Sequence, residues 1–225
     1  MLDYLGPYLL GPNDENQGIY TGDARELAKA IPDESVDLIF TDPVYDRIDD
    51  YRWLAETAAR VLKPDSACLV WHGTSNLPDI TRAMSDWLRY FWQIACYLPT
   101  LRQFALAPTL FNKWRSCLIY GRGTVRPMKS LQDFAHDLPS NGDNHKWAKT
   151  PDVTLRIVDS FCDRCSVILD PFTGGGTVPA VCKMLGRRWL AFEIDPDTAE
   201  RARERVRMTQ PPLFVPEPEQ MELEL

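Results

Sequence analysis

The segment that decides the fold is VILDPFTGGGTVPAVCKMLGRRWLAFEID, residues 167–195. It begins with a short apolar run, residues 167–169, which has the length and composition of a buried strand. A glycine-rich turn follows at residues 173–177, and then a helical stretch that Gly186 ends. A second apolar run, residues 189–192, is closed by acidic residues. Strand, glycine turn, helix, strand and acid within roughly thirty residues have the spacing of a nucleotide-binding βαβ unit.

Two features of this unit limit the kinds of ligand it could bind. Glu193 stands at the end of the second strand, where a carboxylate can hold two ribose hydroxyls. The full G-x-G-x-x-G pattern that cradles a pyrophosphate is absent from the turn. Together these features favour an adenosyl ligand without a pyrophosphate, such as S-adenosylmethionine, over a dinucleotide. The alternative is a helix-capping turn in an ordinary α/β protein.

A second apolar run far upstream, residues 36–40, leads into Thr41-Asp42-Pro43-Val44-Tyr45. This run and the glycine turn together resemble the two motifs of the amino-group DNA methyltransferases, which methylate the exocyclic amine of adenine or cytosine. The family's usual catalytic motif is Asp-Pro-Pro-Tyr, and Val44 takes the place of its second proline here. The catalytic motif precedes the cofactor motif, which is the order of the circularly permuted β group. The resemblance covers residues 20–206.

The resemblance implies a catalytic role for Asp42, Pro43 and Tyr45. The Asp42 carboxylate and the Pro43 carbonyl would accept the two hydrogens of the target amine, and Tyr45 would stack on a base flipped out of the duplex. Aspartate at position 42 favours adenine over cytosine. The cofactor would be S-adenosylmethionine, and its expected contacts are Asp23, Lys149, Thr150, Asp170, Phe172, Gly174, Gly176, Thr177 and Glu193.

Three of these contacts have a simpler structural reading. Asp23 precedes a helical stretch and can serve as its N-cap as well as meet the adenine amine of the cofactor. Thr150, followed by a proline at the first helical position, is a good N-cap in the same way. Lys149 would pair with the cofactor's carboxylate, but a plain capped helix fits the spacing nearly as well.

Strands and helices alternate along the chain, which predicts an α/β fold with a doubly wound, mainly parallel sheet. The resemblance makes this a Rossmann-like, circularly permuted, S-adenosylmethionine-dependent methyltransferase fold with the catalytic and glycine-turn strands side by side at its centre. Strands are expected at residues 19–21, 36–40, 67–71, 91–98, 117–120, 167–169 and 189–192, and helices at residues 24–30, 51–62, 77–90, 151–161, 178–186 and 197–207.

One domain accounts for most of the chain. Residues 1–18, rich in glycine, proline and asparagine, are expected to form an irregular arm before a single methyltransferase domain at residues 19–208. Residues 121–144 have the composition of a long loop and are the candidate target-recognition segment. The proline- and glutamate-rich residues 209–225 are expected to be a disordered acidic tail.

The charge is unevenly distributed. The formal net charge of the 225 residues is −7, which does not favour DNA binding by itself. Residues 87–132, however, contain no acidic residue in an otherwise acidic chain. This basic window predicts a surface that faces a polyanion, although a solvated face is the simpler explanation of any basic run. Its candidate DNA contacts are Arg115, Arg122, Arg126 and Lys129.

Composition indicates whether the protein binds metal, which compartment it occupies and whether it associates with a membrane. Six scattered cysteines include one C-x-x-C pair, Cys162 and Cys165, which is more often incidental than zinc-binding, so no metal site is predicted. Reduced thiols fit a cytoplasmic protein. Neither a membrane-spanning run nor a signal peptide is recognisable, and no membrane partner is expected.

Double-stranded DNA is the expected partner, and a homodimer is left open. The segment Gln210-Pro211-Pro212-Leu213-Phe214 is similar to the short peptides by which bacterial replication and repair proteins bind the DNA sliding clamp. Packing of Leu213 and Phe214 on the parent domain is the favoured alternative. Two other functions remain: methylation of another amine substrate, such as RNA or a protein side chain, and a non-catalytic relative that binds cofactor or DNA.

Overall fold

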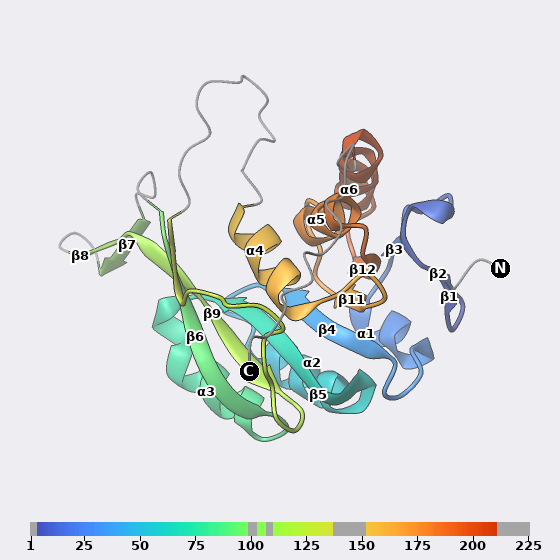
Figure 1. Ribbon diagram of the computed structural model, residues 1–225. Coiled ribbons are helices and arrows are strands. Elements are labelled where there is room, and N and C mark those ends of the chain that lie inside the picture. The colour runs from blue at the N-terminus through green and yellow to red at the C-terminus, as the bar shows by residue number, and fades with distance from the viewer. Residues whose placement is uncertain (1–3, 99–102, 107–109, 137–151, 211–225) are drawn as a thin grey trace, which may run out of the picture.

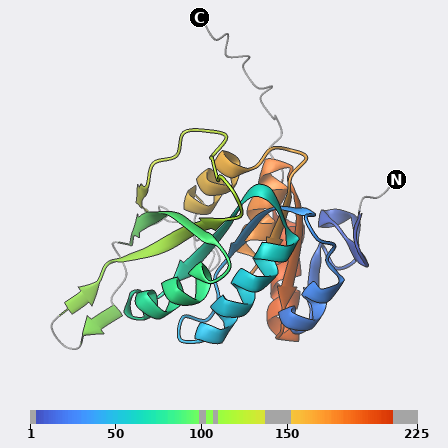
Figure 2. The same cartoon turned by 90° about the horizontal axis from the view of Figure 1, so that it is seen from below.

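The computed structural model describes residues 4–98, 103–106, 110–136 and 152–210. A twisted central sheet lies between two layers of helices, which Figure 1 shows from the side and Figure 2 from below. This arrangement confirms the predicted α/β class. Apolar strands that are buried on both faces require helices on both sides of the sheet. No described helix is long and apolar enough to cross a membrane.

The central sheet has eight strands in the order β10-β6-β9-β5-β4-β11-β12-β3. Every neighbouring pair is parallel except the two pairs that β9 makes, so β9 alone runs against the other strands. The bounds are β3 Ile19–Thr21, β4 Val36–Thr41, β5 Leu62–His72, β6 Arg89–Tyr97, β9 Trp114–Gly121, β10 Phe134–His136, β11 Val167–Asp170 and β12 Arg188–Glu193. The mainly parallel sheet is as predicted.

Strands β4 and β11 are neighbours at the middle of the sheet, as expected. Leu38 pairs with Ile168 and Ile39 with Leu169 in parallel register. These four side chains are fully buried. Parallel strands have their carboxyl ends at one edge of a sheet, so the catalytic segment after β4 and the glycine turn after β11 emerge together.

Two hydrophobic layers sandwich the sheet. One face is covered by α1 and α2 with α3, and the other by α4, α5 and α6 (Figure 1). Each helix buries an apolar stripe at helical spacing, as Leu54, Ala58 and Val61 do on α2. The bounds are α1 Ala24–Leu27, α2 Ile48–Val61, α3 Leu77–Ser85, α4 Asp152–Phe161, α5 Thr177–Leu185 and α6 Pro196–Met208; the 3₁₀ turns are η1 Gly11–Asn13, η2 Ala28–Ala30 and η3 Thr74–Asn76.

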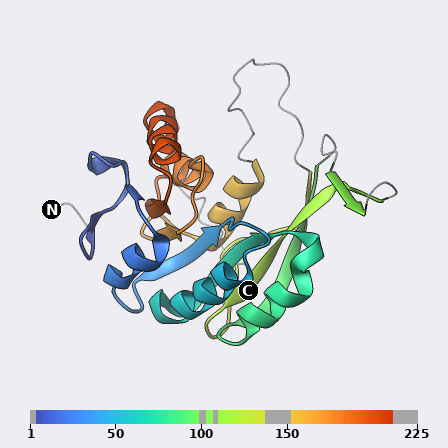
Figure 3. The same ribbon diagram turned by 180° about the vertical axis from the view of Figure 1, so that it is seen from behind.

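The N-terminal segment, expected to be irregular, contains a short hairpin, β1 Tyr4–Leu5 with β2 Tyr8–Leu9. It packs beside the β3 edge of the sheet (Figure 3). The buried carboxylate of Asp14 accepts hydrogen bonds from the Tyr20 hydroxyl on β3 and from the Gly18 amide. Trp189 on β12 donates to a carbonyl of the same segment. Residues 5–18 therefore contribute to the hydrophobic core, which the polar composition did not indicate.

Other boundaries also differ from the sequence prediction. The helix expected at residues 77–90 ends at Ser85, and β6 begins at Arg89. Strand β5 begins at Leu62, five residues before the strand expected at residues 67–71. Residues 99–112 contain a hairpin, β7 Gln103–Leu106 with β8 Leu110–Asn112. Inside the expected loop at residues 121–144, β10 adds an outer strand beside β6.

Several expectations lie outside the described residues. These are the expected cofactor contacts Lys149 and Thr150, the later part of the candidate recognition loop, and the tail from residue 211. All six cysteines are free thiols, five of them buried and Cys165 exposed. Within the described part of the chain, no three histidine, cysteine or acidic side chains form a cluster that could hold a metal ion.

Candidate active site

The glycine turn after β11 has a backbone that only glycine adopts without strain. Gly174 and Gly176 have φ angles of +50° and +73°. A Cβ on Gly176 would lie 2.9 Å from the Cβ of Ala202, so this glycine lets α6 pack closely against the start of α5. A Cβ on Gly174 would meet nothing within 4 Å. The Gly174 backbone therefore faces open space, where a ligand can approach it.

Glu193 at the end of β12 joins this turn to its neighbours. Its carboxylate accepts hydrogen bonds from the Gly174 amide at 2.9 Å and from the Asp195 amide at 3.0 Å. Its backbone carbonyl accepts from the Gly22 amide at 2.9 Å. A carboxylate has about four acceptor positions, so two remain for ribose hydroxyls after these two bonds are made. These bonds give Glu193 a structural role, and its expected contact with the ribose stays a prediction.

Asp23 lies next to this group, at the carboxyl end of β3. Its side chain accepts from the Arg25 amide at 2.8 Å and caps α1. The capping role is thus observed, and a cofactor contact stays a prediction. Ile194, which follows Glu193, is 68% exposed, an unusual exposure for isoleucine. It offers an apolar surface beside the acid, which the sequence interpretation overlooked.

Asp170, also expected to contact the cofactor, is 4% exposed and faces the catalytic strand. Its carboxylate accepts from the Thr41 hydroxyl at 2.7 Å and weakly from the Phe172 amide at 3.4 Å. Burial raises the pKa of this carboxyl to about 7, and the hydrogen bonds offset that rise only in part. Asp170 therefore ties β11 to the residue that precedes Asp42.

The catalytic segment leaves the sheet directly after Thr41. Pro43 is buried, whereas the Asp42 side chain is 45% exposed and Val44 is 54% exposed. An exposed carboxylate beside a buried proline is arranged to meet a ligand from solvent. Val44 points its small apolar side chain outward, so the missing second proline leaves the burial of Pro43 unaffected.

Tyr45 is fixed by two residues that the sequence interpretation did not single out. Asn76 donates from its side-chain amide to the Tyr45 carbonyl at 2.7 Å. A Cβ on Gly73, which follows β5, would lie 3.0 Å from the Tyr45 Cβ, so a side chain at this position would crowd Tyr45. Burial, and then the negative charge of Asp42, raise the pKa of the Tyr45 hydroxyl well above its usual value. Tyr45 and Asp42 thus lie together.

The basic window does not form one surface. Arg115 is at the start of β9, within 4.0 Å of the Asp42 carboxylate. Arg122 follows the other end of β9, pairs with Glu34 at 2.7 Å and donates to the Leu62 carbonyl. Lys129 pairs with Asp159 at the end of α4, and Arg126 is exposed. Only Arg115 of the four expected DNA contacts is placed at the catalytic segment.

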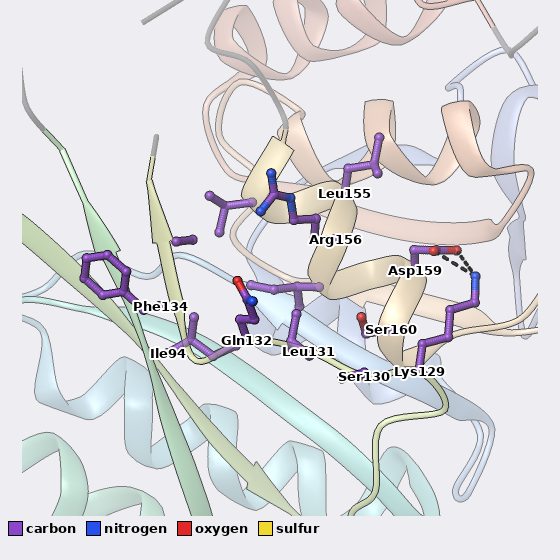
Figure 4. Close-up of a pocket in the computed structure, with 13 residues that line it drawn as sticks. Ile94, Lys129, Ser130, Leu131, Gln132, Phe134, Leu155, Arg156, Asp159 and Ser160 are labelled. Atoms are coloured by element: carbon purple, nitrogen blue, oxygen red, sulfur yellow. Dashed lines mark hydrogen bonds and ion pairs between the residues drawn. The ribbon is translucent and has the colours of Figure 1, made fainter. Parts of the chain in front are cut away.

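A cavity of about 400 Å³ lies elsewhere, between α4 and the β6–β10 edge (Figure 4). Ile94 and Phe134 line its sheet side and Arg156 its helix side, and the Lys129–Asp159 ion pair borders it. No residue of the catalytic segment or of the glycine turn lines it. The chemistry-bearing residues gather instead at the carboxyl edge of β4, β11 and β12.

The residues at this edge fit an adenosyl cofactor. The cofactor could pass close to the backbone at Gly174, where the space is open. Its ribose could bond to the spare acceptor positions of Glu193, and its adenine could pack on the exposed Ile194. Phe172, half-buried, stacks edge-on against Trp53 at a centroid distance of 5.6 Å and forms one wall beside the turn.

Solved structures share this fold. The PvuII DNA methyltransferase, described as cytosine-N4-specific, superposes with a TM-score of 0.72 at 15% identity over 83% of this chain and 85% of that one. M1.HpyAVI in complex with SAM gives a TM-score of 0.68 at 19% identity over 84% of this chain and 98% of that one. The predicted α/β fold is therefore shared with solved methyltransferase structures.

Sequence comparisons give the family. Residues 109–204 match the family model described as DNA methylase, N6_N4_Mtase. The type II methyltransferase M.BamHI of Bacillus amyloliquefaciens is 27% identical over 78% of this chain and 54% of its own length, so the chain spans about half of that relative. The DNA adenine methyltransferase YhdJ of Escherichia coli K12 is 26% identical over 81% of this chain and 80% of its own length. These matches confirm the resemblance to the N6-adenine and N4-cytosine DNA methyltransferases seen in the sequence.

The buried Asp170 carboxyl makes stability depend on pH. Its pKa is about 7 in the folded chain, against about 3.9 for an unfolded aspartate, so the unfolded state releases this proton first as pH rises. Its contribution to the unfolding free energy is fully present below pH 4 and falls until pH 7. Asp170→Asn removes this titration. The stability of the variant relative to wild type should rise between pH 4 and pH 8 by something on the order of 4 kcal/mol.

Urea unfolding at several pH values measures this difference. The comparison between pH values cancels any fixed effect of the amide on the Thr41 hydrogen bond. An Asn variant whose stability runs parallel to wild type over the whole range would contradict the prediction.

Proposed function

We propose that this chain transfers a methyl group from S-adenosylmethionine to the exocyclic amine of a base flipped out of double-stranded DNA, with adenine N6 favoured. The observation that carries the proposal is the pairing of β4 with β11, which brings Asp42 and the Gly174 turn to the same edge of the sheet. About 130 residues separate the two motifs in the chain, and the match to the DNA methylase family model supports the same function.

The target amine is a weak nucleophile because its lone pair is delocalised into the ring. The half-exposed Asp42 carboxylate would accept one N–H and the Pro43 carbonyl the other, which draws the nitrogen towards tetrahedral geometry and frees the lone pair. S-adenosylmethionine supplies a methyl group on a sulfonium, which needs no activation as a leaving group. The protein's contribution is then positioning and electrostatics.

The extruded base needs a surface to replace its lost stacking. Tyr45, held by Asn76 and Gly73, would supply a rigid ring for this purpose, and base–aromatic stacking contributes about 1–3 kcal/mol. The exposed Val44 adds apolar area beside that ring. Asp42 in the first position of the motif supports adenine, but relatives of this chain include both an adenine enzyme and a cytosine-N4 enzyme.

Incubation with labelled cofactor tests the function directly. Duplex DNA, RNA and a protein extract are offered separately, and labelled DNA is digested to nucleosides for mass spectrometry. N6-methyladenine is the expected product, and N4-methylcytosine would assign the other base. Label in RNA or protein alone would identify a different substrate, and no transfer to any of the three would leave a non-catalytic relative. Sequencing modified bases from a methylation-free host would give the recognition site.

Removal of the Asp42 carboxylate should abolish activity without loss of cofactor. For Asp42→Ala we expect kcat to fall by roughly 10²–10³-fold, the effect of losing one electrostatic contact to the reacting group. S-adenosylmethionine affinity, measured by calorimetry, should be unchanged. Asp42→Asn keeps an acceptor oxygen and should retain more turnover than Asp42→Ala. Turnover of the alanine variant near wild type would remove Asp42 from the mechanism.

Glu193 should determine cofactor affinity. Glu193→Ala is expected to weaken S-adenosylmethionine binding by roughly 1.5–3 kcal/mol, the size of hydrogen bonds to a charged group. Glu200→Ala, which changes an exposed glutamate on α6, is the matched control and should bind normally. Thermal melts without cofactor show how much of the effect comes from the lost bonds to Gly174 and Asp195. Equal affinity of the two variants would contradict the assignment.

The remaining details of the site are also proposals. The order of the motifs supports membership of the circularly permuted β group. DNA would approach the carboxyl edge of the sheet, where Arg115 lies. DNA contact by Arg122, Arg126 and Lys129 stays a prediction, and the ion pairs of Arg122 and Lys129 reduce the charge they can offer. Residues 121–144 remain the candidate recognition segment.

A sliding clamp is a further proposed partner, through residues 210–214. Gln210 is exposed at the end of the described chain, and the segment that follows lies outside the described residues. A fluorescent peptide spanning residues 208–220 is expected to bind purified clamp with micromolar affinity, since two apolar anchors and a polar latch fit a pocket. A peptide with Leu213 and Phe214 changed to alanine is the control. Equal binding of both peptides would exclude this site. Light scattering of the full chain would show whether it forms a homodimer.

A further inference from the structure

Arg115 is held at the catalytic edge by its strand. Trp71 pairs with Cys117 and His72 with Ser116 across β5 and β9. Arg115 precedes Ser116 on β9 and therefore lies just beyond the carboxyl end of β5. Side chains alternate between the faces of a sheet, which puts Arg115 on the same face as Trp71. The guanidinium carbon lies 4.1 Å from the centroid of the Trp71 ring. This is a close cation–π arrangement on a buried indole.

This packing differs from that of a phosphate contact on a DNA-binding surface. The Arg115 side chain is only 33% exposed, and its Nε atom is buried without a hydrogen-bond partner in the described structure. The indole holds the planar guanidinium in one orientation, so few rotamers remain to be lost on binding. A fixed, partly buried donor is suited to contact one particular group of a ligand.

The guanidinium and the Asp42 carboxylate face the same space. The distance from Nη1 of Arg115 to Oδ2 of Asp42 is 4.0 Å, too long for a direct hydrogen bond. An ion pair this long between partly exposed groups adds little to stability. The Tyr45 hydroxyl lies close enough to both groups for each to influence it. A hydrogen-bond acceptor, Asp42, and a donor, Arg115, therefore stand side by side next to the aromatic ring.

The edge of the target base has the complementary pattern. Adenine presents the N6 amine as a donor beside the N1 acceptor, and cytosine presents the N4 amine beside N3. Guanine and thymine present an oxygen acceptor beside an N–H donor on this edge, which is the reverse order. We propose that Arg115 donates to the ring nitrogen next to the target amine while Asp42 accepts from that amine. This inference rests on the proposed function and names the group that reads the flipped base.

Guanine and thymine would each set an N–H against the guanidinium and an oxygen against the carboxylate. Arg115 and Asp42 would therefore reject both bases. They would accept adenine and cytosine alike, since both place a ring acceptor beside the amine. The choice between these two bases then belongs to other contacts. Arg115 serves binding rather than nucleophilicity, because its bond to the ring nitrogen exists before methyl transfer begins.

A cycle that changes both partners of this hydrogen bond tests the proposal. The substrate is a duplex with the methylated sequence found for this chain, carrying either adenine or 1-deazaadenine at the target position. The deaza base replaces the N1 acceptor with C–H and keeps the amine; 3-deazacytosine serves for a cytosine target. Wild type is compared with Arg115→Met, whose side chain still covers Trp71.

For wild type, the deaza base should lower kcat/KM by roughly 10- to 100-fold, the range for a hydrogen bond from a charged donor. For Arg115→Met, the same substitution should lower it much less, because the donor is already gone. Any intrinsic change in the reactivity of the deaza amine is common to both enzymes and cancels. Arg82→Met, which removes an exposed arginine on α3, is the control and should keep the full deaza penalty.

The same deaza penalty in wild type and Arg115→Met would overturn the proposal. If the variant does not fold, the wild-type measurement can still refute the proposal, because equal methylation of adenine and 1-deazaadenine would exclude a bond to N1. The outcomes separate the two proposals. Failure of wild type to methylate the adenine duplex refutes the methyltransferase function itself, whereas methylation with an unchanged deaza penalty refutes only the role of Arg115.

Discussion

The hydrogen bond from the Thr41 hydroxyl to the buried Asp170 carboxyl joins the two halves of the site. Thr41 directly precedes Asp42, the proposed acceptor of the target amine, and Asp170 ends β11 three residues before the glycine turn begins. Parallel pairing of β4 and β11 sets the two strands side by side, and this bond fixes their ends at matching height. Burial penalises the charged form of Asp170. Above neutral pH, where this carboxyl ionises, the free energy of unfolding is therefore lower. The relative position of acceptor and cofactor turn depends on this hydrogen bond.

Glu193 has the corresponding role on the cofactor side. The Glu193 carboxylate accepts hydrogen bonds from Gly174 in the glycine turn and from Asp195 at the start of α6. The Glu193 backbone carbonyl accepts from the amide of Gly22, which follows β3. Arg205 on α6 supports the same turn by donating to the Gly175 carbonyl and the Thr177 hydroxyl. Charged side chains thus replace an extended hydrophobic contact where the sheet edge must stay open to a ligand.

The central strands could be predicted because their information is local. Apolar runs such as residues 36–40 and 189–192 are buried on both faces and need only helices above and below. The peripheral strands could not be predicted in this way. β10 and the β7–β8 hairpin are short, and half-exposed residues such as Phe134 and Phe111 carry them. Their strand character comes from pairing with a neighbour that the tertiary structure supplies. The order of the N-terminal segment has the same origin, because the Tyr20 hydroxyl on β3 donates to its buried Asp14 carboxylate.

The sequence by itself determined the fold class, the resemblance to the amino-group DNA methyltransferases and the two motifs that carry it, because these depend on local composition and on order along the chain. It could not determine what surrounds Asp42. Arg115 and Arg122 are seven residues apart and looked equivalent as members of one basic window. They lie at opposite ends of β9, roughly 23 Å apart along an extended strand. One guanidinium stacks on Trp71 at the catalytic edge, and the other pairs with Glu34 at the far edge. Only strand direction and pairing, which are tertiary properties, decided which arginine belongs to the site.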